Sequence, residues 1–166
     1  MITLIEGLPG TGKTTLIQRL SDHWGRGNCT GFFTEEIRRS GGSRTGFAWR
    51  TFDGKSGLLA DLQPGSPRVG KYRVALESFD AMLPDLTVVK AGKILLIDEV
   101  GKMECLSAKF RKLLAVWEAL DCRRIFTVPA RGTPFIETFK SRNGGYIVQI
   151  TRGNREELLS RLTQEG

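Results

Sequence analysis

The feature that most constrains this chain is a glycine-rich motif near its start. A short, mostly apolar run at residues 2–6 leads directly into GLPGTGKT at residues 7–14. This order matches G-x-x-x-x-G-K-T, the phosphate-binding loop that joins a strand to a helix. In such a loop the backbone N–H groups point at phosphate oxygens, the lysine lies over the β- and γ-phosphates and the threonine hydroxyl suits Mg²⁺. The motif therefore predicts binding of a nucleoside triphosphate, with Mg²⁺ as cofactor. The residues expected to contact the nucleotide are Gly7, Leu8, Pro9, Gly10, Thr11, Gly12, Lys13, Thr14 and Thr15.

The residues after the motif predict an amphipathic helix over 15–24. Apolar side chains recur there at helical spacing: Leu16, Ile17, Leu20 and Trp24. Gly25 is suited to end the helix. The phosphates would then lie at the positive, N-terminal end of the helix.

A second motif is acidic and supplies the carboxylates that a phosphate-binding loop needs for Mg²⁺ and for the attacking water. The apolar run at 94–97 is typical of a central parallel strand, and it ends at Asp98 and Glu99. Ligands of such sheets bind at the carboxyl ends of the strands, so we expect Asp98 to hold Mg²⁺ together with Thr14. Glu99 is expected to accept a proton from the attacking water. The same segment fits the D-x-x-G pattern of switch GTPases, but the chain lacks N-K-x-D, which argues against a regulatory G protein.

A cation is also expected near the γ-phosphate, because a P-loop lysine alone usually gives slow turnover. The candidates are Lys102, Arg38 and Arg131. Lys102 is nearest to Glu99 in sequence and is predicted to be catalytic. Each of the three is equally compatible with a solvated surface charge.

The order of the remaining segments predicts an α/β fold with a doubly wound, mostly parallel sheet. Strands are expected at 30–37, 47–52, 71–74, 93–98, 124–128 and 146–151. Helices are expected at 78–91, 107–120, 134–140 and 155–162, and residues 56–70 resemble a loop. We expect one domain over 1–166, with a β-hairpin inserted at about 37–52.

Composition excludes several other classes of protein. The three cysteines lack C-x-x-C spacing, which favours reduced thiols in a cytoplasmic protein. No apolar run approaches the length of a membrane span, and the chain begins with its first expected strand, so we expect no signal peptide and no membrane partner. The net charge is +7, but Lys and Arg are dispersed, which argues against nucleic acid as the main partner.

Several longer strings resemble the THEP1-type nucleoside-triphosphatases over nearly the whole chain. The matching strings are GLPGTGKTT at 7–15, GFFTEEIR at 31–38, Gly46-Phe47, VGKY at 69–72, IDEVGKME at 97–104 and Asn154-Arg155. The resemblance implies a RecA-like P-loop domain with a small added β element. It also implies slow, Mg²⁺-dependent hydrolysis of nucleoside triphosphates, such as ATP and GTP, to diphosphate and phosphate, with broad base preference.

The resemblance leaves two other functions open and some roles undecided. Asn154 and Arg155 either line the nucleotide or cap the last helix. A nucleotide or small-molecule kinase would use Glu99 for an acceptor hydroxyl and the hairpin arginines as a lid: Arg38, Arg39, Arg44 and Arg50. A nucleotide-dependent binding module, for example on RNA, is the third class.

Overall fold

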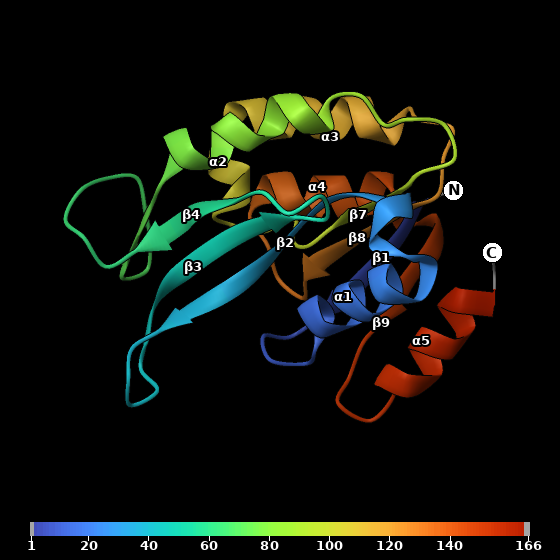
Figure 1. Ribbon diagram of the computed structural model, residues 1–166, viewed down its shortest axis with the longest axis horizontal. Helices are drawn as coiled ribbons and strands as arrows, with labels where there is room; N and C mark the ends of the chain where they lie inside the picture. Colours follow the sequence, from blue (N-terminus) through green and yellow to red (C-terminus); the bar gives the residue numbers. More distant parts are fainter. Residues whose placement is uncertain (1, 165–166) are drawn as a thin grey trace.

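The computed structural model describes residues 2–164, and within them nine strands form one sheet with helices on both faces (Figure 1). The strand order across the sheet is β5-β6-β4-β3-β2-β7-β8-β1-β9. The strands are β1 (Ile2–Gly7), β2 (Cys29–Arg38), β3 (Arg44–Thr51), β4 (Ser56–Asp61), β5 (Arg68–Val69), β6 (Tyr72–Val74), β7 (Ile94–Ile97), β8 (Arg124–Pro129) and β9 (Ile147–Gln149).

The part of the sheet from β2 to β9 is parallel. The strand β1 lies between β8 and β9, and β7 lies between β2 and β8, all in the same direction. The carboxyl ends of β1 and β7 therefore reach the same edge of the sheet, at Gly7 and Ile97. This edge is where α/β sheets bind ligands.

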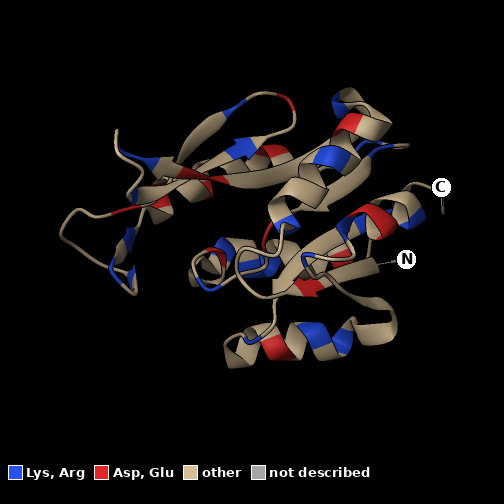
Figure 2. Ribbon diagram, turned by 90° about the horizontal axis from the view of Figure 1, so that it is seen from below, with Lys and Arg blue, Asp and Glu red and all other residues tan. Residues whose placement is uncertain are grey.

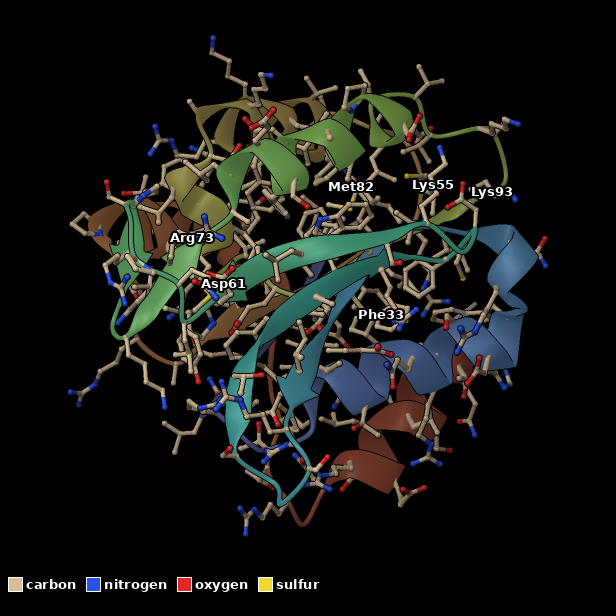
Figure 3. All side chains as sticks on the ribbon, turned by 60° about the vertical axis from the view of Figure 1, so that its left-hand side comes forward. Phe33, Lys55, Asp61, Arg73, Met82 and Lys93 are labelled. Atoms are coloured by element: carbon tan, nitrogen blue, oxygen red, sulfur yellow. The ribbon has the colours of Figure 1, made fainter. Side chains whose placement is uncertain are left out.

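Helices cover both faces because successive strand residues point to opposite sides. The helices are α1 (Lys13–Trp24), α2 (Leu76–Met82), α3 (Ala108–Glu118), α4 (Pro134–Arg142) and α5 (Arg155–Gln164), with 3₁₀ turns η1 (Arg26–Asn28), η2 (Leu83–Leu86), η3 (Glu104–Leu106) and η4 (Gly144–Tyr146). Leu4 packs in the core beneath α2, α3 and α4, whereas its neighbour Ile5 packs beneath α1 and α5. In Figure 3, Met82 and Phe33 mark these two faces. The doubly wound α/β prediction is confirmed.

The helix α3 illustrates how the sequence specifies one of these layers. Its first turn is capped by the Ser107 hydroxyl, which accepts a 3.0 Å hydrogen bond from the Phe110 N–H. Its buried stripe has helical spacing and consists of Phe110, Leu113, Leu114 and Trp117. Burying each such side chain contributes about 1.5–3 kcal/mol, so this stripe fixes α3 against the sheet.

An antiparallel extension continues the sheet beyond β2. The strand β2 pairs with β7 at its start and then continues outward to pair with β3, so the hairpin expected at 37–52 grows from a core strand that begins at Cys29. The extension is larger than that hairpin, because β4, β6 and β5 follow β3 across the sheet. Asp61 on β4 and Arg73 on β6 form an ion pair at 2.5 Å, visible in Figure 3.

The prediction of a loop at 56–70 was wrong in part, because β4 and β5 lie there. The pairs Pro64-Gly65 and Ser66-Pro67 made this segment resemble a loop. Gly57 on β4 packs beneath a ring, since a Cβ added there would lie 2.4 Å from Cζ2 of Trp49 on β3. The pairing with β3 is a tertiary contact that the local sequence does not report.

Other expected boundaries also shift. The helix expected at 78–91 is the shorter α2 followed by η2, because Pro84 lacks an N–H and interrupts regular helical bonding. The last strand spans only Ile147–Gln149, since residues 144–146 form η4. Residues 1, 165 and 166 of the expected domain lie outside the described residues.

Candidate functional site

The glycine-rich motif forms the tight connection from β1 to α1. Gly10 and Gly12 have φ values of 76° and 98°, in the left-handed region that favours glycine. Gly12 is also limited by space, because a Cβ there would lie 2.7 Å from Nε of Arg155. The loop is therefore shaped both by its own glycines and by the start of α5.

The side chain of Lys13 lies back over this loop. Its Nζ donates hydrogen bonds to the carbonyl oxygens of Gly7 at 2.9 Å and Leu8 at 3.3 Å. Nζ also lies 3.6 Å from Oε1 of Glu99. The ammonium thus connects the glycine-rich loop with the end of β7.

Asp98 follows β7 and is 1% exposed. Three hydroxyl-bearing residues donate to its carboxylate. Thr14 donates at 2.7 Å through its hydroxyl, Thr127 donates at 3.0 Å through its hydroxyl, and Thr34 donates at 3.3 Å through its backbone N–H. Burial raises the pKa of Asp98 above its ordinary value, and these hydrogen bonds oppose that rise.

These groups have the chemistry that Mg²⁺ requires. Mg²⁺ prefers oxygen ligands and is usually held by one or two carboxylates together with substrate phosphates. The Thr14 hydroxyl and the Asp98 carboxylate provide such oxygens at 2.7 Å from one another. Among residues 2–164, no three His, Cys, Asp or Glu side chains gather into a group that could hold a metal ion.

Two further acids lie beyond Asp98. Burial raises the pKa of Glu99, while Lys13 opposes the rise. Glu104 is buried in η3, and burial together with the nearby Glu99 carboxyl raises the pKa of Glu104 well above its ordinary value. Both carboxyls lie against Gly101, where an added Cβ would be 2.6 Å from Glu104 Oε2 and 3.1 Å from Glu99 Oε2.

A cleft of about 1100 Å³ runs across this edge of the sheet. The glycine-rich loop, Asp98 and Glu99 form one side of it. The antiparallel extension supplies the other side through Arg44, Phe47 and Tyr72. Nε of Arg44 donates to the Tyr72 hydroxyl at 3.0 Å, and its guanidinium carbon lies 5.1 Å from the Phe47 ring centroid. The extension therefore forms a structured wall facing the glycine-rich loop.

Comparisons with known proteins agree with this geometry. The family model NTPase_1, described as NTPase, matches residues 2–163. The nucleoside-triphosphatase THEP1 of Thermotoga petrophila is 41% identical over 167 residues, covering 98% of this chain and 90% of the relative. The cancer-related nucleoside-triphosphatase of Homo sapiens is 35% identical over 175 residues, covering 93% of this chain and 90% of the relative.

The chain belongs to this NTPase family. The crystal structure of THEP1 from Aquifex aeolicus matches with a TM-score of 0.86 at 31% identity, covering 98% of this chain and 96% of that chain. The predicted resemblance to THEP1-type nucleoside-triphosphatases is confirmed, and so is the fold class that it implies.

Within this NTPase fold, the three candidate cations lie in different places. Lys102 and Arg131 are exposed and line a second cavity that adjoins the cleft. Arg38 lines neither cavity. Its Nε instead donates to Glu36 at 2.9 Å, and Nη1 donates to the Gly42 carbonyl at 2.5 Å within the hairpin.

Asn154 and Arg155 have different surroundings. The Asn154 side chain accepts a 2.8 Å hydrogen bond from the Thr151 N–H and donates to the Gln149 carbonyl, so it braces the loop before α5. Its backbone carbonyl accepts the first intrahelical bond of α5 from the Leu158 N–H, so Asn154 occupies the N-cap position. Arg155 lines the cleft.

Sequence reasoning missed several residues of this site. Thr127 follows the apolar run of β8 and contacts Asp98 only because β8 lies beside β7. From the local sequence alone, Glu104 resembles an ordinary polar residue in a loop, and Tyr72 resembles an aromatic residue on an edge strand. A signal did exist, since IDEVGKME and VGKY include Glu104 and Tyr72 and match the family.

Proposed function

We propose that this chain hydrolyses nucleoside 5′-triphosphates to diphosphate and phosphate. The observation that carries the proposal is the position of Lys13, which lies between the glycine-rich loop and Glu99 while the adjacent Thr14 bonds to Asp98. One short segment thus combines phosphate binding, an oxygen site for a cation and a carboxylate for the attacking water. The relatives described above are named nucleoside-triphosphatases, which supports the same activity.

The loop N–H groups and Lys13 would bind the phosphates. The ammonium of Lys13 is held by the Gly7 and Leu8 carbonyls and by Glu99, all weaker partners than a polyphosphate. When a triphosphate enters, Lys13 turns towards the β- and γ-phosphate oxygens. Glu99 then loses its ion pair and becomes free to bind water.

Thr14 and Asp98 would hold Mg²⁺. When bound, this ion would neutralise negative charge on the phosphate oxygens. The buried Asp98 carboxylate is oriented by Thr127 and Thr34, so it has little rotational freedom to lose on binding. This preorganisation favours a cation at one fixed position.

Glu99 would accept the proton of the attacking water. Burial raises the pKa of Glu99, which makes its carboxylate a stronger base. Glu104 lies against the same glycine, Gly101, and is shielded from solvent, so a second buried carboxyl group adjoins Glu99. Both features fit a base that must hold one water in line with the γ-phosphate.

The remaining predicted residues have supporting roles in this proposal. Lys102 and Arg131 are the cations available to neutralise charge beyond the γ-phosphate, since both lie on the cavity that Glu99 also lines. Arg155 supports the phosphate-binding loop from α5. Arg38 acts only within the hairpin, through Glu36.

The proposal extends to specificity and location. The cleft of about 1100 Å³ exceeds what one nucleotide fills, which supports broad base preference. Lys and Arg are spread over many elements in Figure 2, which supports nucleotides rather than nucleic acid as partners. No helix within residues 2–164 is long and apolar enough to cross a membrane. Three cysteines without a disulfide in the described residues suit our proposal of a cytoplasmic, single-domain enzyme.

The test is phosphate release from ATP, GTP, CTP and UTP with Mg²⁺ and no other substrate. We expect steady release from several of them by the wild type. Glu99→Gln should bind nucleotide normally and lose turnover by about 10² to 10⁴-fold, because general base catalysis contributes that much.

Glu157→Gln is the matched control, because Glu157 is an exposed acid on α5. It should hydrolyse at the wild-type rate. Hydrolysis by Glu99→Gln at that same rate would remove Glu99 from the mechanism, and absence of release by the wild type would contradict the proposed activity.

A further inference from the structure

A second cavity of about 390 Å³ adjoins the cleft at Lys13 and Glu99. Its walls are mainly apolar and include Phe47, Leu59 and Val69 from the antiparallel extension and Met103 from the segment after β7. This volume and this lining are typical of pockets for small organic molecules. Hydrolysis alone requires neither this volume nor this apolar lining, because a water molecule is small and polar.

The cavity meets the cleft at the groups proposed for catalysis. Lys13, Thr34 and Glu99 line both spaces, and so do the apolar side chains of Phe47, Val69 and Met103. A molecule in the cavity would therefore present one end to the Glu99 carboxylate and to the γ-phosphate held beside Lys13. The same molecule would displace water from this face of Glu99.

One wall of the cavity is rigid before any ligand binds. Pro129 and Ala130 follow β8, and their carbonyl oxygens accept hydrogen bonds from Nζ of Lys140 at 3.3 and 3.2 Å. Lys140 is itself buried and pairs with Glu6 at 2.5 Å. A fixed wall of this kind lowers the entropic cost of ligand binding.

Two cations lie on this cavity without a partner of their own. Lys102 and Arg131 line it and are exposed, and within residues 2–164 neither forms an ion pair. An apolar pocket with free cations suits a ligand that has an apolar body and an acidic group.

We propose that the cavity binds a small organic alcohol with an apolar body and a carboxylate or phosphate group, and that its hydroxyl accepts the γ-phosphoryl group. The inference rests on the proposed function for triphosphate binding and for Glu99. The alcohol oxygen bonds to the γ-phosphorus, and the bond from that phosphorus to the oxygen bridging the β-phosphate breaks. The hydroxyl proton goes to Glu99. The products are a phosphate monoester and a nucleoside diphosphate, so atoms and charge balance without any redox partner.

The test uses para-(hydroxymethyl)benzoate, which has a hydroxyl, an apolar ring and a carboxylate in that order. Diphosphate, phosphate and phosphate ester are measured by phosphorus NMR in reactions with Mg²⁺ and ATP. We expect ester to form and phosphate to fall below diphosphate by the same amount. With para-methylbenzoate, which lacks the hydroxyl, phosphate should equal diphosphate.

The outcomes separate this inference from hydrolysis itself. Equal diphosphate and phosphate with the hydroxyl probe would overturn the acceptor site and leave the hydrolase intact. Ester formation without any phosphate release in the absence of alcohol would support the acceptor site and contradict the hydrolase. Absence of diphosphate in every reaction would contradict both.

Variants locate the acceptor. Ala130→Phe fills the cavity and should lower the ratio of ester to phosphate by at least about tenfold, whereas Ala115→Phe adds the same bulk on the exposed face of α3 and should not change it. An unchanged ratio in Ala130→Phe would overturn the site.

A surface variant covers the case in which Ala130→Phe fails to fold. Lys102→Ala should raise the ratio of KM for para-(hydroxymethyl)benzoate to KM for the uncharged para-methylbenzyl alcohol about tenfold, whatever its effect on turnover. An unchanged ratio of the two KM values would overturn the role of Lys102 as an anchor.

Discussion

The hydroxyl of Thr14 donates a 2.7 Å hydrogen bond to Oδ2 of Asp98, across 84 residues of sequence. This bond connects the first turn of α1 to the end of β7 and brings the two motifs of a P-loop site into one place. Its donor is a hydroxyl and its acceptor a buried carboxylate, which are the two protein oxygens that we propose for Mg²⁺.

Asp98→Asn tests this relationship. The amide is isosteric and can still accept the Thr14 hydrogen bond, but it lacks the charge. We expect turnover with saturating Mg²⁺ and ATP to fall by about 10² to 10³-fold, and a higher Mg²⁺ concentration to be needed for half-maximal rate. Because burial already disfavours the charged form of Asp98, thermal stability should not fall.

The control is Asp121→Asn, an exposed acid in the connection before β8. Its Mg²⁺ dependence should match that of the wild type. A wild-type Mg²⁺ dependence in Asp98→Asn would assign the metal to other oxygens.

Lys13→Ala should lower triphosphate affinity by at least about 100-fold, or about 2.7 kcal/mol. Lys13 is the cation nearest to both the loop carbonyls and Glu99, so its removal leaves the phosphates without a charge partner there. The measurement is equilibrium binding of a fluorescent ATP analogue. Lys112→Ala on the exposed face of α3 should bind as the wild type does, and retained affinity in Lys13→Ala would contradict the phosphate-binding assignment.

The sequence predicted the parts of this site in which one short motif carries the chemistry. The glycine-rich loop with Lys13 and Thr14 is contiguous in sequence, and Asp98 with Glu99 follows one apolar strand, so both were recognisable without tertiary information. Parallel strand order then placed the two motifs at one edge.

The parts that could not be predicted depend on strand neighbours. Thr127 reaches Asp98 only because β8 packs against β7, and Glu104 is buried only because η3 folds over Gly101. The wall that faces the loop belongs to the extension in which β4 pairs with β3, and there Gly57 on β4 packs beneath the Trp49 ring on β3. Local patterns report periodicity and turns, but not which surfaces meet.

Arg155→Ala should weaken nucleotide binding without changing the chemical step. Nε of Arg155 donates to the Thr11 carbonyl at 2.7 Å and lies against Gly12, so it holds the loop in its curled form. We expect KM for ATP to rise about tenfold with kcat nearly unchanged, because one charge-assisted hydrogen bond is lost. Steady-state kinetics check this, with Arg26→Ala at the exposed 3₁₀ turn after α1 as the control. A fall in kcat at constant KM would instead place Arg155 at the reacting phosphate.

Glu104→Gln should change how stability depends on pH. The pKa of Glu104 is raised well above its ordinary value, first by burial and then by Glu99. The unfolded chain therefore loses this proton near pH 4.3, while the folded protein keeps it to higher pH. The stabilising contribution is complete below that pH and is lost as pH rises through the folded pKa, with a slope of up to about 1.4 kcal/mol per pH unit.

The glutamine variant has no proton to lose, so its free energy of unfolding should rise relative to that of the wild type as pH increases above about 4, until the folded wild type loses the Glu104 proton. Urea unfolding at each pH unit measures this rise, and Glu157→Gln should show none, since Glu157 is exposed. Any difference in packing between the glutamate and glutamine side chains appears as a constant offset and leaves the slope unaffected. Parallel curves for the wild type and Glu104→Gln would mean that Glu104 ionises in the folded protein as readily as in water, and that the acid beside Glu99 carries a charge at neutral pH.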